Sequence, residues 1–469
     1  MFKNFLNSNW PVIILLVLSL LTRFIMLNHP AEVVFDEVYF GQFVQSYFSH
    51  QYYFDIHPPL GKLMIFEFAK IFGFNGQLKF SGINSVLTSG GVLVLRFLPA
   101  LFSVFFVILI YYLILKLKLS KRAAFLGACL VLFDNAILAQ SKFILIDIFL
   151  LFFGFLSLYF LICYKDSEKG SRKSYYFLAL AAIFSTLSFS IKWTGVSFFA
   201  ILLVCLVFNF FRDFNIKRIF INLAIVIVLP FLVYYSVFFV HFNLLYKSGT
   251  GDAYMSPTFQ QTLAATGKAN SLSAWEKFIE LNQKMYFYNS TLKATHPYSS
   301  KWYQWPLDKR PIWYWTETVN NKISNIYLFG NPIVWYSVLL AIIFSITIIP
   351  FKHFRKQLPP IFYLLLFAYF LNLLPFIFIS RVAFLYHYLP SLVFGILVLI
   401  TLYDRMASDG KSKPEDGLSF FPSKKHAALY VSYLFVLIAI FIIISPLTYG
   451  IPVSRGLSNF YSHFIGLFL

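Results

Sequence analysis

The sequence predicts an all-α protein that crosses a membrane many times. Of its 469 residues, 59% are hydrophobic and 12% are charged, and the mean hydropathy is +0.72. A soluble domain has roughly 45–50% apolar and about 25% charged residues. The apolar residues form long unbroken runs, whereas a transmembrane barrel would show alternating strands of about ten residues. Helices that span lipid therefore explain this composition better than a soluble or barrel fold.

About eleven apolar runs approach the length of a span, which needs about 20 mainly apolar residues. They lie at 11–27, 92–115, 123–139, 143–163, 175–191, 194–211, 219–240, 331–350, 360–379, 383–402 and 428–447. The run at 11–27 has no small-residue cleavage site, so we expect a retained anchor rather than a signal peptide. No soluble stretch divides the runs, and we expect a single transmembrane domain over residues 1–469.

The Lys and Arg residues predict the orientation of these spans. Short loops rich in Lys and Arg alternate with short connections that hold only Lys142, Lys192 and Arg381. Since cytoplasmic loops are enriched in Lys and Arg, we expect a cytoplasmic N-terminus in the plasma membrane. Two long connections, 28–91 and 241–330, are then extracytoplasmic and contain loop helices, and a linker at 403–427 is cytoplasmic.

The net charge is +19, but the sequence has no basic helix and no aromatic RNA-binding signature. We therefore expect membrane lipids and no nucleic acid as partners. The three cysteines lie inside apolar runs without ligand-like spacing, which argues against a disulfide framework and a zinc site. Nucleotide and zinc-protease motifs are absent, so ATP hydrolysis and zinc proteolysis are unsupported.

Polar side chains gather on the predicted outer side, where they are costly at membrane depth and usually mark a site. Asp36 and Glu37 are adjacent carboxylates shortly after the first span. Such a pair either supplies a general base or forms the acidic start of a loop helix. His57 precedes two prolines, and a lone His of this kind is more often structural than catalytic.

The next polar residues lie around the turn between the third and fourth spans. Gln140 and Lys142 fall in that turn, and Asp147 lies just inside the following span. They either form part of a site or stabilise the turn as a local Asp–Lys pair.

Single cations stand at the predicted outer membrane boundary, at Arg96, Lys192 and Arg381. Arg96 either extends its charge to the interface or binds a lipid phosphate. For Lys192 the alternative to a role in the site is an interface anchor. His387 opens the tenth span, and His296 begins a segment in which five of the eight tryptophans lie between 302 and 335. The tryptophans form either an interface belt or a surface on which a sugar stacks.

Seven motifs occur in order between about residues 11 and 400, and together they resemble the protein O-mannosyltransferase family, a membrane-embedded (GT-C) class of glycosyltransferase. The motifs are Phe-Asp-Glu-Val at 35–38, His-Pro-Pro-Leu-Gly-Lys at 57–62, Arg-x-x-Pro at 96–99, Asp-Asn at 134–135 with Gln-Ser-Lys-Phe-Ile-Leu-Ile-Asp at 140–147, Ser-x-Lys-Trp-x-Gly at 190–195, His-Pro-Tyr-Ser-Ser-Lys-Trp at 296–302 with Trp-Pro-Leu at 305–307, and Leu-Tyr-His-Tyr-Leu-Pro at 385–390.

The resemblance implies inverting transfer of mannose from a polyprenyl-phosphate carrier to Ser or Thr hydroxyls of exported proteins. It maps the catalytic base to Asp36, with Glu37 as second choice. It maps contacts with the carrier phosphate to Arg96, Gln140 and Lys192 and, where the family usually has Arg, to Lys142. No cofactor or metal is expected.

Two departures from the family pattern matter. The connection at 241–330 is too short for the soluble insert of eukaryotic members, which indicates a bacterial type, and Tyr39 replaces a common His. Transfer of another sugar to a lipid or glycan is the alternative. A secondary transporter is a remote one, because the sequence has no internal repeat and its polar residues gather at one membrane face.

Overall fold

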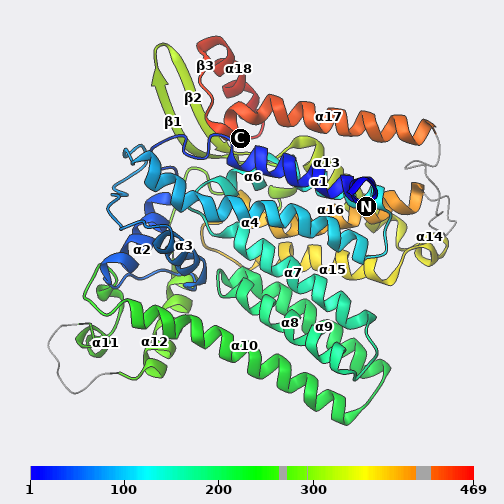
Figure 1. Ribbon diagram of the computed structural model, residues 1–469, viewed down its shortest axis with the longest axis horizontal. Helices are drawn as coiled ribbons and strands as arrows, with labels where there is room; N and C mark the ends of the chain where they lie inside the picture. The colour runs from blue at the N-terminus through cyan, green and yellow to red at the C-terminus, as the bar shows by residue number, and fades with distance from the viewer. Residues whose placement is uncertain (1, 264–271, 293, 408–423) are drawn as a thin grey trace.

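In the computed structural model, which describes residues 2–263, 272–292, 294–407 and 424–469, long helices run side by side along one axis (Figure 1). A helix occupies each of the eleven predicted runs. These helices are α1 (Phe2–Phe24), α4 (Ser89–Lys116), α5 (Lys121–Leu132) with α6 (Asn135–Lys142), α7 (Asp147–Asp166), α8 (Arg172–Phe189), α9 (Val196–Arg212), α10 (Ile216–Leu244), α13 (Pro332–Ile348), α15 (Pro360–Leu373), α16 (Leu389–Ala407) and α17 (Lys424–Tyr449).

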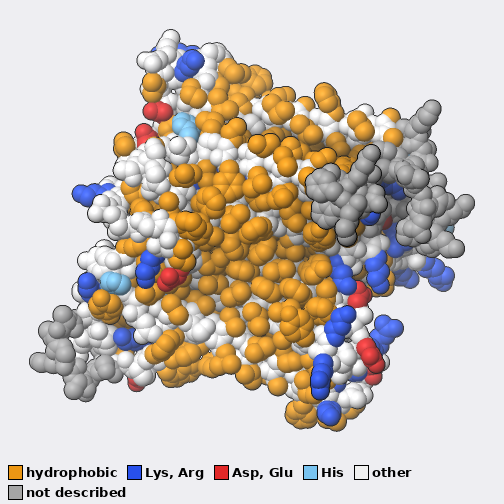
Figure 2. Space-filling model, viewed as in Figure 1, with side chains coloured by type: hydrophobic (Ala, Val, Ile, Leu, Met, Phe, Trp, Pro, Cys, Tyr) orange, Lys and Arg blue, Asp and Glu red, His pale blue; other side chains and the backbone are white. Residues whose placement is uncertain are grey.

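Seven helices of the described chain are long and apolar enough to cross a membrane, or eight if a bent pair counts as one span. The apolar parts of α1 and α13 are shorter. Hydrophobic side chains cover the middle of the molecule, and charged side chains lie toward its ends (Figure 2). These features agree with a polytopic membrane protein, and the count of eleven spans stays a prediction.

The third predicted span is broken, because α5 and α6 meet at an angle of 57°. Asp134 starts α6, with its carboxylate accepting a hydrogen bond from the Ile137 amide at 2.9 Å. The buried Arg23 guanidinium donates to the carbonyl of Leu132 at 2.7 Å, which satisfies the backbone at the break. Gln140 and Lys142 are buried on α6, so the prediction that they lie in a turn was wrong.

The two long connections lie at the same end of the helices (Figure 1) and contain α2 (Glu37–Ser49), α3 (Leu60–Ile71), α11 (Pro257–Gln261) and α12 (Ala274–Thr291). Backbone hydrogen bonds join the connections, with the Tyr52 amide donating to the Lys247 carbonyl at 2.8 Å. At the far end, α14 (Lys352–Gln357) follows α13. Most of the predicted linker at 403–427 falls in 408–423, outside the described residues.

The expectation of an all-α chain was wrong in one region, where β1 (Ile312–Val319), β2 (Lys322–Leu328) and β3 (Val453–Ser454) form an antiparallel sheet in the order β1-β2-β3. Asn320 and Asn321 make the two-residue turn between β1 and β2 with φ of 48° and 65°. That conformation matches the twist of a hairpin, and Asn tolerates it. The C-terminal α18 (Arg455–Gly466) follows β3.

Candidate active site

Asp36 lies directly before α2. The contacts of the neighbouring Phe35 hold the backbone in place at this point. Phe35 has a φ of 46°, its amide donates to the Tyr314 carbonyl at 3.1 Å, and its ring stacks on that of Tyr314 with centroids 4.2 Å apart. The hairpin strand β1 thus fixes the loop that carries Asp36. The half-buried Asp36 carboxylate makes no hydrogen bond to any residue that the structure describes.

The surroundings of Asp36 suit it to accept a proton near neutral pH. Burial raises the pKa of Asp36 to about 7, and the positive charge of Lys192 partly opposes that increase. A carboxyl group with this pKa is about half deprotonated at pH 7, which is the condition that favours general-base catalysis.

Glu37, by contrast, is fully buried and fully hydrogen-bonded. Its two oxygens accept hydrogen bonds from Nε and Nη2 of Arg96 at 2.8 and 2.7 Å and from the amides of Val34 and Ile144 at 2.9 Å each. Arg96 directs its other donors to the carbonyls of Leu27, Pro30 and Glu32. Neither side chain has a free group for a ligand, so this geometry does not favour the predicted phosphate contact of Arg96 or the base role of Glu37.

A second ion pair, between Lys192 and Asp147, lies near Asp36. Lys192 Nζ is 2.8 Å from each carboxylate oxygen of Asp147. The side-chain amide nitrogen of Gln140 donates to the same carboxylate at 2.7 Å, and Tyr314 Oη donates to the side-chain oxygen Oε1 of Gln140 at 2.6 Å. Lys192 Nζ also lies 4.9 Å from the centre of the Tyr386 ring. Asp147, Gln140 and Lys192 thus form one hydrogen-bonded network.

His57 borders the site beside a third ion pair. Lys62 pairs with Asp55 and donates to the His57 carbonyl at 2.9 Å. Burial, and then the charges of Lys192 and Arg381, lower the pKa of His57 well below its ordinary value. His57 is therefore neutral at physiological pH.

The remaining predicted residues are divided between the site and its surroundings. Lys142 points away, because its Nζ donates to the Ile25 carbonyl at 2.6 Å and lies 4.6 Å from the centre of the Tyr449 ring. His296 and Arg381 line a pocket of about 1050 Å³. His387 stacks on Trp305, which lines the same pocket, with ring centroids 5.9 Å apart.

Two family models match the chain. The model of the family "Dolichyl-phosphate-mannose-protein mannosyltransferase" matches residues 13–246. The model of the "C-terminal four TMM region of protein-O-mannosyltransferase" matches residues 274–463. The chain belongs to the protein O-mannosyltransferase family.

The chain matches only part of longer relatives in this family. The chain is 32% identical over 262 residues to "Dolichyl-phosphate-mannose--protein mannosyltransferase 4" of Candida albicans, which covers 53% of this chain and 35% of the relative. It is 30% identical over 259 residues to "Protein O-mannosyltransferase 1" of Drosophila melanogaster, covering 53% and 29%. The matched region thus spans about a third of these relatives.

Two solved structures share the fold. A chain of the S. cerevisiae protein O-mannosyltransferase Pmt1–Pmt2 complex bound to its sugar donor aligns with a TM-score of 0.85 at 21% identity, covering 97% of this chain and 91% of that one. ArnT from Cupriavidus metallidurans, bound to undecaprenyl phosphate, aligns with a TM-score of 0.52 at 13% identity, covering 98% and 76%. The predicted GT-C-like fold of this mannosyltransferase family member is confirmed.

Sequence reasoning missed three residues of the site: Tyr314, Tyr386 and Lys62. Tyr314 lies in a run rich in aromatic and β-branched residues followed by two asparagines, a pattern that signals a hairpin. Tyr386 and Lys62 stood inside recognised motifs without an assigned role. Among the described residues, no group of three or more His, Cys, Asp or Glu side chains is placed to hold a metal ion.

Proposed function

We propose that this protein transfers a mannosyl residue from a polyprenyl-phosphate carrier to Ser or Thr hydroxyls of exported polypeptides, with inversion. The observation that carries this proposal is the contrast within the acidic pair. Glu37 is saturated by four hydrogen bonds, whereas Asp36 is unengaged among the described residues and has a pKa of about 7. A family member with a free, poised carboxylate beside a buried cation has the parts that such a transfer needs.

In the proposed step, the acceptor hydroxyl oxygen attacks the anomeric carbon while the bond from that carbon to the phosphate oxygen breaks. Asp36 takes the hydroxyl proton, and the polyprenyl phosphate leaves with the bonding electrons. General-base assistance of this kind contributes about 10²–10⁴-fold to rate. Lys192 supplies positive charge where the phosphate becomes more anionic, in a site that excludes much of the water.

We revise the roles of the other predicted residues accordingly. Arg96 and Glu37 are positioning residues, because their ion pair holds the backbone that precedes Asp36. Gln140 and Asp147 orient Lys192. Lys142 stabilises the packing of α6 on α1 and does not bind the carrier phosphate.

In the proposed orientation, this site faces the extracytoplasmic side of the plasma membrane and the N-terminus lies in the cytoplasm. The loops between α4 and α5, α7 and α8, and α9 and α10 carry many Lys and Arg residues, and blue side chains gather at the end of the molecule away from β1, α2 and α3 (Figure 2). Cytoplasmic loops are enriched in these residues. An impermeant thiol reagent should label a cysteine placed at position 39 in intact cells, and a cysteine at position 170 should stay unlabelled.

The function is tested with full-length protein purified in detergent, labelled dolichyl-phosphate mannose and a peptide rich in Ser and Thr. We expect transfer to the peptide and none from a nucleotide-linked mannose, because no nucleotide-binding motif is present in the sequence. A parallel reaction offers a lipid or glycan acceptor. Transfer only to that acceptor would replace the protein substrate, and no transfer from any polyprenyl-phosphate sugar would reject the proposal.

A further inference from the structure

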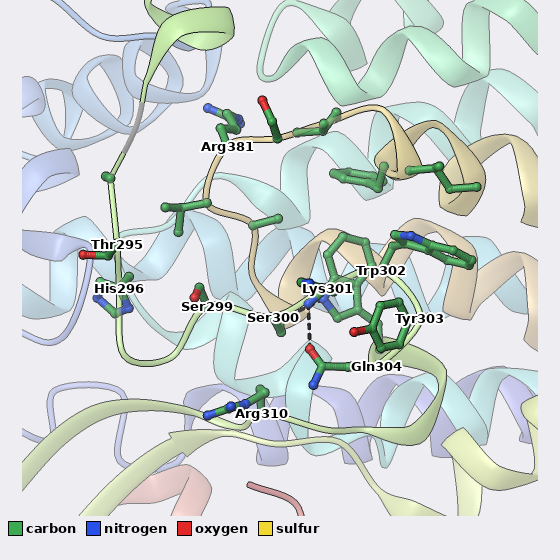
Figure 3. A pocket seen from close by; sticks show the side chains of 18 of the residues that line it. Thr295, His296, Ser299, Ser300, Lys301, Trp302, Tyr303, Gln304, Arg310 and Arg381 are labelled. Carbon is green, nitrogen blue, oxygen red and sulfur yellow. Dashed lines mark hydrogen bonds between the residues drawn. The ribbon is translucent and has the colours of Figure 1, made fainter.

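A large pocket lies between the loop that precedes β1 and the segment that joins α15 to α16. Its volume is about 1050 Å³, which is at the upper end of the range for ligand sites. Its walls consist of residues 294–297, 299–305, 310, 376–377 and 379–383 (Figure 3). We call it the cationic pocket, because of the charges described next.

The cationic pocket carries three positive side chains that form no ion pair within the described chain. Lys301, Arg310 and Arg381 line it, and no Asp or Glu is among the described residues of its wall. Within the described chain, the side chains of these three residues make no hydrogen bond or ion pair. Uncompensated cations around a concave surface concentrate anionic ligands.

The positions of the charges indicate an extended ligand. In Figure 3, Arg381 and Arg310 stand on opposite sides of the pocket, with Ser299 between them, and Lys301 lies on the segment that follows Ser299. A single phosphate would need these cations to converge on one point. A polypeptide that bears several carboxylates would meet them one after another.

The cationic pocket adjoins the candidate active site. Trp305, in its wall, stacks on His387. The neighbouring Tyr386 ring lies 4.9 Å from Lys192 Nζ. The charge of Arg381 also reaches His57. The segment 381–387 therefore belongs to both the pocket wall and the reaction centre.

We propose that the cationic pocket binds acidic residues that flank the acceptor Ser or Thr, so that the enzyme prefers acidic polypeptide segments. This inference rests on the proposed function. Carboxylates of the acceptor would pair with Lys301, Arg310 and Arg381, while the hydroxyl approaches Asp36. Charge complementarity of this kind gives specificity between similar substrates.

The test uses full-length enzyme, dolichyl-phosphate mannose and three peptides with one Ser/Thr core, flanked by Asp, Asn or Lys. For the wild type we expect kcat/KM to be at least about tenfold higher with the Asp-flanked than with the Lys-flanked peptide. The ratio should shrink as salt screens the charges. The double variant Lys301→Glu/Arg310→Glu should reverse the order of the Asp-flanked and Lys-flanked peptides.

Lys322→Glu is the matched control, because Lys322 is exposed on β2 and outside the pocket. It should keep the wild-type preference. Equal use of the three peptides by the wild type, or an unchanged preference in the double variant, would overturn the inference and leave the proposed function standing. A third outcome would also overturn the inference: the double variant loses activity equally with all peptides, and phosphatidylglycerol raises the activity of the wild type. That outcome would assign the pocket to an anionic lipid. No transfer to any peptide would instead reject the proposed function.

Discussion

Arg96 donates two hydrogen bonds to the carboxylate of Glu37, at 2.8 and 2.7 Å, and both side chains are fully buried. The pair joins α4 to the start of α2, next to Asp36. Glu37 also accepts from the amide of Val34 before Asp36 and from the amide of Ile144 after α6. One ion pair therefore holds three segments around the proposed base, which makes Asp36 and Glu37 unequal although they are adjacent.

The first prediction concerns the stability that this ion pair provides. Glu37→Gln should lower the free energy of unfolding by about 3–5 kcal/mol, because it leaves the Arg96 charge buried without its partner. Denaturation in detergent measures the change. Glu67→Gln is the control, since Glu67 is exposed on α3, and it should change stability by no more than about 0.5 kcal/mol. A Glu37→Gln protein as stable as the wild type but inactive would point to a chemical role for Glu37.

Asp36→Asn should impair turnover without impairing folding. Its turnover should fall by about 10²–10⁴-fold, the usual contribution of a general base. Its folding should not be weakened, because the Asp36 side chain makes no hydrogen bond within the described chain that would be lost. Turnover with dolichyl-phosphate mannose and a Ser/Thr peptide is compared with thermal unfolding of the same sample. Retention of more than about a tenth of wild-type turnover would assign the base to another residue.

The pH dependence of the reaction should reveal the same carboxylate. The deprotonated form of Asp36 is the active one, so turnover should rise with pH along a limb centred near the pKa of about 7. The free energy of unfolding should depend on pH in the opposite direction. A carboxyl whose pKa is raised on folding stabilises the fold at low pH, and this contribution declines as pH rises from about 4 toward 7. Asp36→Asn should lose both the rate limb and this part of the decline. An ordinary limb near pH 4 would contradict the buried environment of Asp36.

Local patterns in the sequence predicted much of the fold. A span of about 20 apolar residues is recognisable by itself, so a helix was expected wherever one occurs. The break between α5 and α6 was not expected, because it depends on Arg23, which reaches Leu132 from a position 109 residues away. The hairpin was missed because its aromatic residues were interpreted only as an interface belt or a sugar-stacking surface.

The sequence indicated which residues belong to the candidate site, but it did not show which of them bond to one another. Motifs indicated that Asp36, Glu37 and Arg96 matter, yet nothing in the chain order shows that Arg96, 59 positions from Glu37, neutralises it. The link from Tyr314 to Gln140 spans 174 positions. Such partners become visible only when the helices pack, and they decide which cation or carboxylate is free for a ligand.

The last prediction separates structure from chemistry at Lys192. Lys192→Gln leaves the Asp147 carboxylate buried without its cation, so stability should fall by about 3–5 kcal/mol together with turnover. In the double variant Lys192→Gln/Asp147→Asn the uncompensated charge is gone, and most of the stability should return. Turnover should stay low, because the positive charge that stabilises the leaving phosphate is still absent. Unfolding and turnover are measured on the same samples. Recovery of turnover together with stability would make Lys192 a structural residue, since the fold alone would then account for its effect.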